Sequence, residues 1–314
     1  MSSFCGEHVG CRALAVLDTL RELPVAAWLL YPTRDAPRSE RFGPYELELA
    51  VDAGVAGEGL PLVVLSHGNG STPWVHRWLA MQLVRRGVVV AVIEHPGNNR
   101  KDNSLSDAAG VSKLANLENR PRHVGLVIDA AYADPHVGPT LAHGVAVIGE
   151  SIGGYTALAI AGGHAMTLPD DVGLAQRLAP DAETVRRAFR VVTERDPRVR
   201  AIVLLSPAVF WFMADGALAD VTIPILARTG ERDELCPPEL VERVLRGVPD
   251  PSRVHHTIVP GAAHFSFQSP YPPALAGPGF APSVDPPGFD RASYQHVLAD
   301  DIVAFLRDTL GSST

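Results

Sequence analysis

The sequence predicts an α/β protein with a mostly parallel central sheet flanked by helices. Short, continuous apolar runs occur at residues 60–66, 88–94 and 145–148. Such runs are typical of parallel strands that are buried on both faces. Segments with helical apolar spacing alternate with them, at residues 73–86 and 122–133. This alternation gives a parallel sheet covered by helices on both sides.

Further expected elements continue the pattern towards both ends of the chain. They are a hairpin at residues 13–16 and 25–30, a strand near the edge of the sheet at 44–51, a helix after Ser151, strands at 199–206, 223–229 and 254–259, and an amphipathic helix at 294–310. Active sites in parallel sheets lie beyond the carboxyl ends of the strands. Four strand ends therefore matter most, and they lead into His67, His95, Ser151 and Asp233.

We expect a single domain over residues 1–314, because one α/β domain often reaches this length. Two segments interrupt the alternation of strands and helices. Residues 167–195 are charged but keep helical apolar spacing, which predicts a small cap insertion. Residues 269–289 are rich in proline and glycine, which predicts a surface loop.

The composition argues against several classes of protein. The chain carries 27 basic and 35 acidic residues, a net charge of −8, so we expect no nucleic-acid partner. The apolar stretch at 14–30 is interrupted by Asp18, Arg21 and Glu22, so we expect no membrane span. The N-terminal residues lack the apolar core of a signal peptide. We therefore expect a cytoplasmic protein, and the sequence carries no signal for its oligomeric state.

The chain has three cysteines, Cys5, Cys11 and Cys236. This low, odd count does not suggest a disulfide framework. Cys5, His8 and Cys11 have a spacing that could bind metal, but a closed zinc site needs a fourth ligand. No fourth ligand lies nearby in the sequence, so we expect no metal site.

The sequence Gly149-Glu150-Ser151-Ile152-Gly153 lies between an apolar strand and an Ala-rich helix. G-x-S-x-G at a strand-to-helix junction is the context of a nucleophilic serine. The small residues avoid clashes in the sharp turn, and the hydroxyl stands at a helix N-terminus that favours developing negative charge. The alternative is a Gly-rich turn with an incidental serine.

A serine nucleophile needs a base and an orienting acid. We expect His264 to be the base, because it follows the strand at 254–259 in a glycine-bearing loop. His255 and His256 lie within that strand, and His296 lies in the closing helix. The alternative for His264 is a loop histidine bonded to the backbone.

Asp233 is the expected orienting acid. It follows the strand at 223–229, whereas the loop after the previous strand has no carboxylate until Asp215. The chain order Ser151, Asp233, His264 is the one that accompanies a serine at such a turn. The alternatives are a solvated charge cluster and an N-cap of the following helix.

The loop after residues 60–66 can supply an oxyanion hole. Its glycines let the backbone approach a substrate oxygen, and removal of one oxyanion donor costs about 10²–10³ in rate. The expected donors are the N–H groups of Asn69 and Ile152, with Gly70 as the alternative to Asn69. We expect His67 to brace this loop. His95 either lines the pocket or anchors its own loop.

Five aromatic residues follow strand ends at the expected active edge, and they are Trp74, Phe210, Trp211, Phe212 and Phe265. Apolar pockets with a few polar groups are the usual small-molecule site. We therefore expect some of these rings to contact a compact apolar or aromatic acyl substrate. The alternative is that they pack as core beneath the cap segment.

The chain resembles the α/β-hydrolase superfamily, and within it the bacterial predicted dienelactone hydrolases related to platelet-activating-factor acetylhydrolases and polyester-cleaving lipases. The segments that carry the resemblance are "LPVAAWLLYPT", "PLVVLSHGNGS", "HPGNN", "GESIGGYTALAIAGG", "GERDELCPP", "GAAHFSF" and "DPPGFDRASYQHVLADDIVAFL". Glu150 is a departure, since histidine is commoner before the serine. The resemblance implies hydrolysis of esters, lactones or related acyl bonds without a metal or organic cofactor.

Other enzyme classes lack their motifs here. The sequence has no H-E-x-x-H for a zinc protease and no G-x-x-x-x-G-K for a nucleotide loop. The leading interpretation is a serine hydrolase that acts on a small ester or lactone. An amidase or peptidase with the same triad is the alternative, and a non-catalytic binding protein on the same fold is the third hypothesis.

Overall fold

A computed structural model describes residues 6–107, 112–165, 191 and 193–311. Its strands are β1 (His8–Asp18), β2 (Leu23–Thr33), β3 (Arg38–Phe42), β4 (Tyr45–Val51), β5 (Leu60–Ser66), β6 (Val89–Ile93), β7 (Leu141–Glu150), β8 (Val199–Leu205), β9 (Ile225–Gly230) and β10 (Val254–Val259). Its α-helices are α1 (Arg77–Val84), α2 (Leu114–Ala133), α3 (Ile152–Ile160), α6 (Pro238–Leu245) and α7 (Arg291–Leu310).

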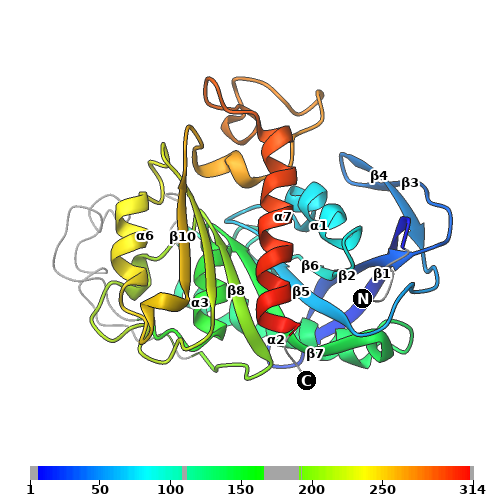
Figure 1. Cartoon of the computed structure of the whole chain (residues 1–314), viewed down its shortest axis with the longest axis horizontal. Helices are drawn as coiled ribbons and strands as arrows, with labels where there is room; N and C mark the ends of the chain where they lie inside the picture. The colour runs from blue at the N-terminus through cyan, green and yellow to red at the C-terminus, as the bar shows by residue number, and fades with distance from the viewer. Residues whose placement is uncertain (1–5, 108–111, 166–190, 192, 312–314) are drawn as a thin grey trace.

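The described strands form one sheet in the order β10-β9-β8-β7-β5-β6-β2-β1-β4-β3 (Figure 1). All neighbours from β10 to β6 are parallel. The N-terminal strands add a mixed part, in which β2 is antiparallel to both β6 and β1. The predicted mostly parallel α/β sheet is therefore confirmed, and the continuous apolar runs are its central, fully buried strands.

Helices cover both faces of the sheet. Apolar residues of α2, α3 and α6 pack in one core cluster. Apolar residues of α1 and α7 pack in the other, and Figure 1 shows α7 crossing the sheet beside α1. Because parallel strands all end at the same edge, the segments after β5, β6, β7, β9 and β10 come together there.

The strand β3 was not expected from the sequence. Its residues, Arg-Ser-Glu-Arg-Phe, lack an apolar alternation, and all are exposed or half-buried. It pairs only with β4 among the described strands, at the outer edge of the sheet. Charged side chains on an edge strand discourage pairing with other molecules, so its polar sequence fits its position.

Helix α2 begins eight residues before the predicted start at residue 122. Pro121 lies inside it, and a proline commonly marks a helix boundary because it has no N–H. The carbonyl of Leu117, four residues earlier, therefore lacks its helical donor. The Tyr155 hydroxyl of α3 donates to this carbonyl at 3.1 Å, which replaces the missing bond.

Two segments were expected to interrupt the fold. The cap predicted at residues 167–195 lies outside the described residues, apart from 191 and 193–195. Residues 269–289 contain no helix or strand longer than the 3₁₀ turn Ala281–Ser283. Arg291 holds this loop, since its guanidinium donates to Asp285 Oδ1 and to the Pro282 carbonyl, each at 2.7 Å.

Candidate active site

Ser151 lies in the turn between β7 and α3. Its backbone has φ 55° and ψ −119°, a region that residues other than glycine rarely adopt. Hydrogen bonds to β8 and the loop after it hold this strained backbone in place. The Ser151 N–H donates to the Leu205 carbonyl at 3.0 Å, and the Ser151 carbonyl accepts from the Ala208 N–H at 2.8 Å. The side chain is half-buried at the carboxyl edge of the sheet.

The two glycines of the motif allow the close packing of this turn. A Cβ at Gly149 would overlap the Gly153 carbonyl, and a Cβ at Gly153 would overlap the Ser66 carbonyl at the end of β5. Side chains at either position would force α3 away from the sheet. The G-x-S-x-G spacing is thus a steric requirement of the turn that presents Ser151.

His264 and Asp233 lie together on the loops after β10 and β9. The imidazole Nδ1 is 3.0 Å from Asp233 Oδ1 and 2.9 Å from Oδ2. Both side chains are buried, with 5% and 4% of the residue exposed. The Leu235 and Cys236 N–H groups also donate to Oδ1, at 3.0 and 2.8 Å, and fix the carboxylate.

The environment of His264 favours its protonated form. Burial alone would lower the pKa of this imidazole, but the hydrogen bond and charge of Asp233, with the charge of Glu150, outweigh burial. The pKa of His264 is consequently raised above the ordinary value of 6.5. A raised pKa makes the neutral imidazole a stronger base, which suits it to accept a proton and return it later.

The structure brings the Asp233–His264 pair and Ser151 to the same edge of the sheet. Among the described residues no hydrogen bond joins Ser151 Oγ to His264. Bonds of this kind often tighten only when substrate binds.

The expected oxyanion loop lies against the nucleophile turn. A Cβ on Gly68 would lie 3.3 Å from Ser151 Cβ. The Ser71 N–H donates to the Gly68 carbonyl at 3.3 Å and closes a turn in which Gly70 has a φ of 57°. Asn69 is exposed at the tip of this turn. Ile152 is the first residue of α3, so its N–H has no partner within the helix.

His67 braces this loop, in agreement with the prediction. Its Nε2 accepts the His95 N–H at 3.4 Å, so its proton is on Nδ1, which donates to the Gly68 carbonyl at 2.7 Å. Burial, together with the charge of Arg120, lowers the pKa of His67 to about 3. The imidazole is therefore neutral, and both of its ring nitrogens are hydrogen-bonded to backbone groups.

The expected pocket residues differ in their exposure. Trp74 is buried, with its ring 5.3 Å from Trp28 and 4.1 Å from Phe42. His95 is also fully buried, which favours the loop-anchor alternative. Phe210 packs as core beside Cys236.

Two of the expected rings keep exposed surface, Trp211 and Phe265. Phe265 stands edge-on to His264 at 5.0 Å between ring centres, and Trp211 lies 5.1 Å from Tyr155. Of the expected pocket residues, Phe265 and Trp211 are therefore the two with accessible aromatic surface.

Glu150 contributes a second buried carboxylate directly before the nucleophile. Its Oε1 accepts the side-chain amide of Gln268 at 2.9 Å. Its Oε2 lies 3.7 Å from His76 Nε2, too far for a good hydrogen bond, so that interaction is electrostatic. Burial opposes ionisation of Glu150, but His76, His264 and Gln268 outweigh it and lower the pKa of the carboxyl. In the sequence, Glu150 stood out only because histidine is commoner at the position before the serine.

The spacing of Cys5, His8 and Cys11 does not lead to a described metal site. Cys5 lies outside the described residues. His8 and Cys11 are three positions apart on β1, so their side chains point to opposite faces of the sheet. Burial raises the pKa of the Cys11 thiol to about 12, which keeps it protonated. In the described part of the chain, no cluster of His, Cys, Asp and Glu could hold a metal ion.

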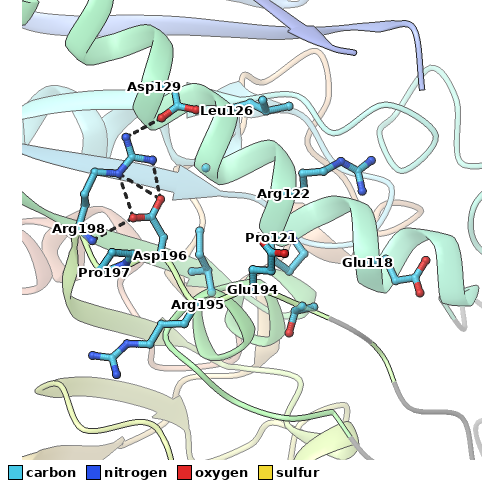
Figure 2. A pocket seen from close by; sticks show the side chains of 13 residues that line it. Glu118, Pro121, Arg122, Leu126, Asp129, Glu194, Arg195, Asp196, Pro197 and Arg198 are labelled. Carbon is cyan, nitrogen blue, oxygen red and sulfur yellow. Dashed lines mark hydrogen bonds and ion pairs between the residues drawn. The ribbon is translucent and has the colours of Figure 1, made fainter. Parts of the chain in front are cut away.

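A pocket of about 550 Å³ lies away from Ser151, between α2 and residues 193–198 ahead of β8 (Figure 2). Arg198 bridges Asp129 and Asp196 in it, with nitrogen–oxygen distances of 2.6 Å. Its lining contains none of the expected site residues.

In the parts of the chain that the structure describes, no helix is long and apolar enough to cross a membrane.

The sheet order, the serine turn and the loops after β9 and β10 together define the α/β-hydrolase fold. A ferulic acid esterase from Streptomyces cinnamoneus has this fold and is similar, with a TM-score of 0.63 and 19% identity over 96% of this chain and 90% of the esterase. A dienelactone hydrolase from Anabaena variabilis ATCC 29413 is similar with a TM-score of 0.54 and 17% identity, over 96% and 99% of the two chains. No family model and no curated protein match the sequence.

Proposed function

We propose that this protein is a serine hydrolase that cleaves a carboxylic ester or lactone of a small apolar or aromatic acyl compound. Two observations support the proposal: Asp233 and His264 form a buried hydrogen-bonded pair, and Ser151 is held in a strained strand-to-helix turn at the same edge of the sheet. Such strain persists only where the surrounding structure enforces it, and it is concentrated at functional sites.

In this mechanism His264 takes the proton of Ser151 as the serine oxygen attacks the acyl carbon. Asp233 holds the Nδ1–H of the imidazole and stabilises the imidazolium that forms. The resulting oxyanion is bound by the N–H groups of Ile152 and Asn69, with Gly70 as the alternative donor. His264 then returns the proton to the leaving oxygen, and a water molecule releases the acyl group from Ser151 by the same steps.

The substrate class has two supports. Phe265 and Trp211 offer exposed aromatic surface near the proposed base and nucleophile helix. Among the similar structures are a ferulic acid esterase and a dienelactone hydrolase. Fold alone does not determine the substrate, so an aromatic ester and an unsaturated lactone are the first compounds to test.

An amidase or peptidase would use the same three residues, since His264 could equally protonate a leaving nitrogen. A non-catalytic binding protein would need neither the buried pair nor the strained serine. The proposal requires no metal or organic cofactor, and its partner is a small acyl substrate. A cytoplasmic location stays a prediction from the sequence.

The test is covalent labelling with a fluorophosphonate, followed by hydrolysis of a panel of p-nitrophenyl esters, aryl lactones and aryl amides. We expect stoichiometric labelling that Ser151→Ala abolishes, and turnover of esters or lactones above amides. Labelling at another residue would overturn the nucleophile assignment, and faster turnover of the amides would favour the amidase alternative.

A further inference from the structure

The largest fully buried side chain of the described residues is a cation, Arg120 on α2. A buried guanidinium is costly unless it is paired or fully hydrogen-bonded. Among the described residues no carboxylate lies within ion-pair distance of it. Burial lowers the pKa of Arg120 to about 9, so the group is still charged at neutral pH. Its position therefore calls for an explanation.

The guanidinium holds three segments around the end of β5. Its Nε donates to Thr156 Oγ1 on α3 at 3.0 Å. Its Nη2 donates to Ser66 Oγ at 3.1 Å and also to the His67 carbonyl. Its Nη1 donates to Asn98 Oδ1 at 2.6 Å. Arg120 thus ties the helix that begins beside the nucleophile to the first residues of the expected oxyanion loop.

A second connection runs from Arg120 to the tip of the same loop. The Asn98 side-chain amide donates to Asn69 Oδ1 at 2.6 Å, and Ser106 Oγ donates to the same oxygen at 2.7 Å. The loop is therefore held at its base through His67 and at its tip through Asn98. A change in the position of the guanidinium would move both points.

A chain of buried side chains links Arg120 to a distant negative charge. His123 Nε2 lies 3.3 Å from Asp18 Oδ2, and His95 Nδ1 lies 3.4 Å from His123 Nδ1. His95 Nε2 lies 2.9 Å from Ser66 Oγ, which in turn accepts from Arg120.

One arrangement of protons satisfies every contact in this chain. His123 donates to Asp18, His95 donates to His123, and Ser66 donates to His95. Each imidazole must then be neutral. Burial lowers the pKa of His123 to about 4 and that of His95 well below its ordinary value, in agreement with neutral rings.

We propose that Arg120 is a positioning residue that fixes the oxyanion loop, and that the chain Asp18–His123–His95–Ser66 holds Arg120 in place. This inference rests on the proposed hydrolase function. The guanidinium acts through the loop: it sets the direction of the Asn69 N–H relative to Ser151. Its loss affects the tetrahedral intermediate more than the bound ester, because only the intermediate carries the oxyanion charge.

The experiment compares Arg120→Met and Arg120→Lys with Arg291→Met, which removes a buried arginine that holds residues 282–285 and makes none of the contacts of Arg120. We measure kcat, KM and melting temperature, together with inhibition by phenylboronic acid, whose serine adduct imitates the tetrahedral intermediate. Arg120→Met should lower kcat by about 10²-fold with a change in KM below about threefold. Boronate affinity should fall in parallel, and Arg120→Lys should be intermediate.

The control and the outcomes separate the two proposals. Arg291→Met should lower melting temperature with kcat within about threefold of wild type. If the wild-type protein neither hydrolyses esters nor labels at Ser151, the proposed function and this role both fall. If it does both and folded Arg120→Met keeps its kcat, only the role of Arg120 is overturned.

A second variant covers the case in which Arg120→Met does not fold. Asn98→Ala removes the link to the loop tip and leaves the guanidinium in place. We expect kcat to fall about tenfold with the fold retained. An unchanged kcat in folded Asn98→Ala would then overturn the proposal.

Discussion

Replacement of Asp233 by asparagine tests the proposed acid through the tautomer of His264. The Leu235 and Cys236 N–H groups both point at Oδ1. In Asp233→Asn the amide oxygen must remain at that position, because an NH₂ group there would face two donors. The NH₂ group therefore takes the place of Oδ2 and faces His264 Nδ1, which lies 2.9 Å from that atom in the wild-type protein.

This exchange reverses the hydrogen bond that orients the base. An amide NH₂ can only donate, so at the shorter of the two contacts it repels a proton on Nδ1 and favours the tautomer with its proton on Nε2. The contact of Nδ1 with Oδ1, at 3.0 Å, then no longer suffices to hold the Nδ1 proton. The nitrogen that should receive the Ser151 proton is then already protonated. We expect kcat to fall about 10⁴-fold, which corresponds to about 5 kcal/mol of activation free energy. Melting temperature should change little, because both backbone bonds to Oδ1 survive.

The assay is steady-state hydrolysis of p-nitrophenyl acetate by folded protein, with Asp215→Asn as the matched control. Asp215 is exposed on the loop after β8, where the acid would otherwise lie. The control should hydrolyse like wild type. A folded Asp233→Asn with more than about a tenth of wild-type kcat would refute the tautomer argument. An inactive Asp215→Asn would place the acid after β8.

Three further outcomes are expected. Ser151→Ala should abolish hydrolysis and fluorophosphonate labelling without unfolding, and residual activity above a few per cent, in a preparation free of other esterases, would exclude Ser151 as the nucleophile. The pH profile of kcat/KM should rise through one limb above 6.5, because neutral His264 is the base and Asp233 and Glu150 raise its pKa; a limb below 6.5 would contradict this assignment. Trp211→Ala should raise KM or shift chain-length preference more than it lowers melting temperature, whereas unfolding with unchanged kinetics of the folded fraction would make Trp211 a core residue.

The sequence predicted those parts of the fold in which local pattern and tertiary role coincide. The strand at 60–66 and the turn at Ser151 are examples, because a doubly covered strand must be apolar and a strained turn must have glycine neighbours. The edge strand β3 was missed because its side chains face water. The first turns of α2 were missed because a proline such as Pro121 commonly marks a helix boundary.

The candidate site was predicted unevenly for a similar reason. Asp233 and His264 follow strand ends, so chain order alone could place them at one edge. Arg120 gave no signal, because one arginine in a helix is usually solvated and only the tertiary structure shows that it is buried. Trp74 and Phe210 also follow strand ends, but the sequence could not show that other rings and side chains would cover them.

The bond from the Tyr155 hydroxyl to the Leu117 carbonyl makes two positions of the chain interdependent. With phenylalanine at 155 and Pro121 retained, a buried carbonyl would have no donor, at a cost of about 1–3 kcal/mol. With alanine at 121, the helix would supply its own N–H to that carbonyl, which has two lone pairs and could still accept from the tyrosine hydroxyl. The cost of losing the Tyr155 hydroxyl should therefore be largest while Pro121 is present and smaller once alanine replaces it. Loss of the tyrosine is thus expected to be tolerated more readily after the proline has been replaced.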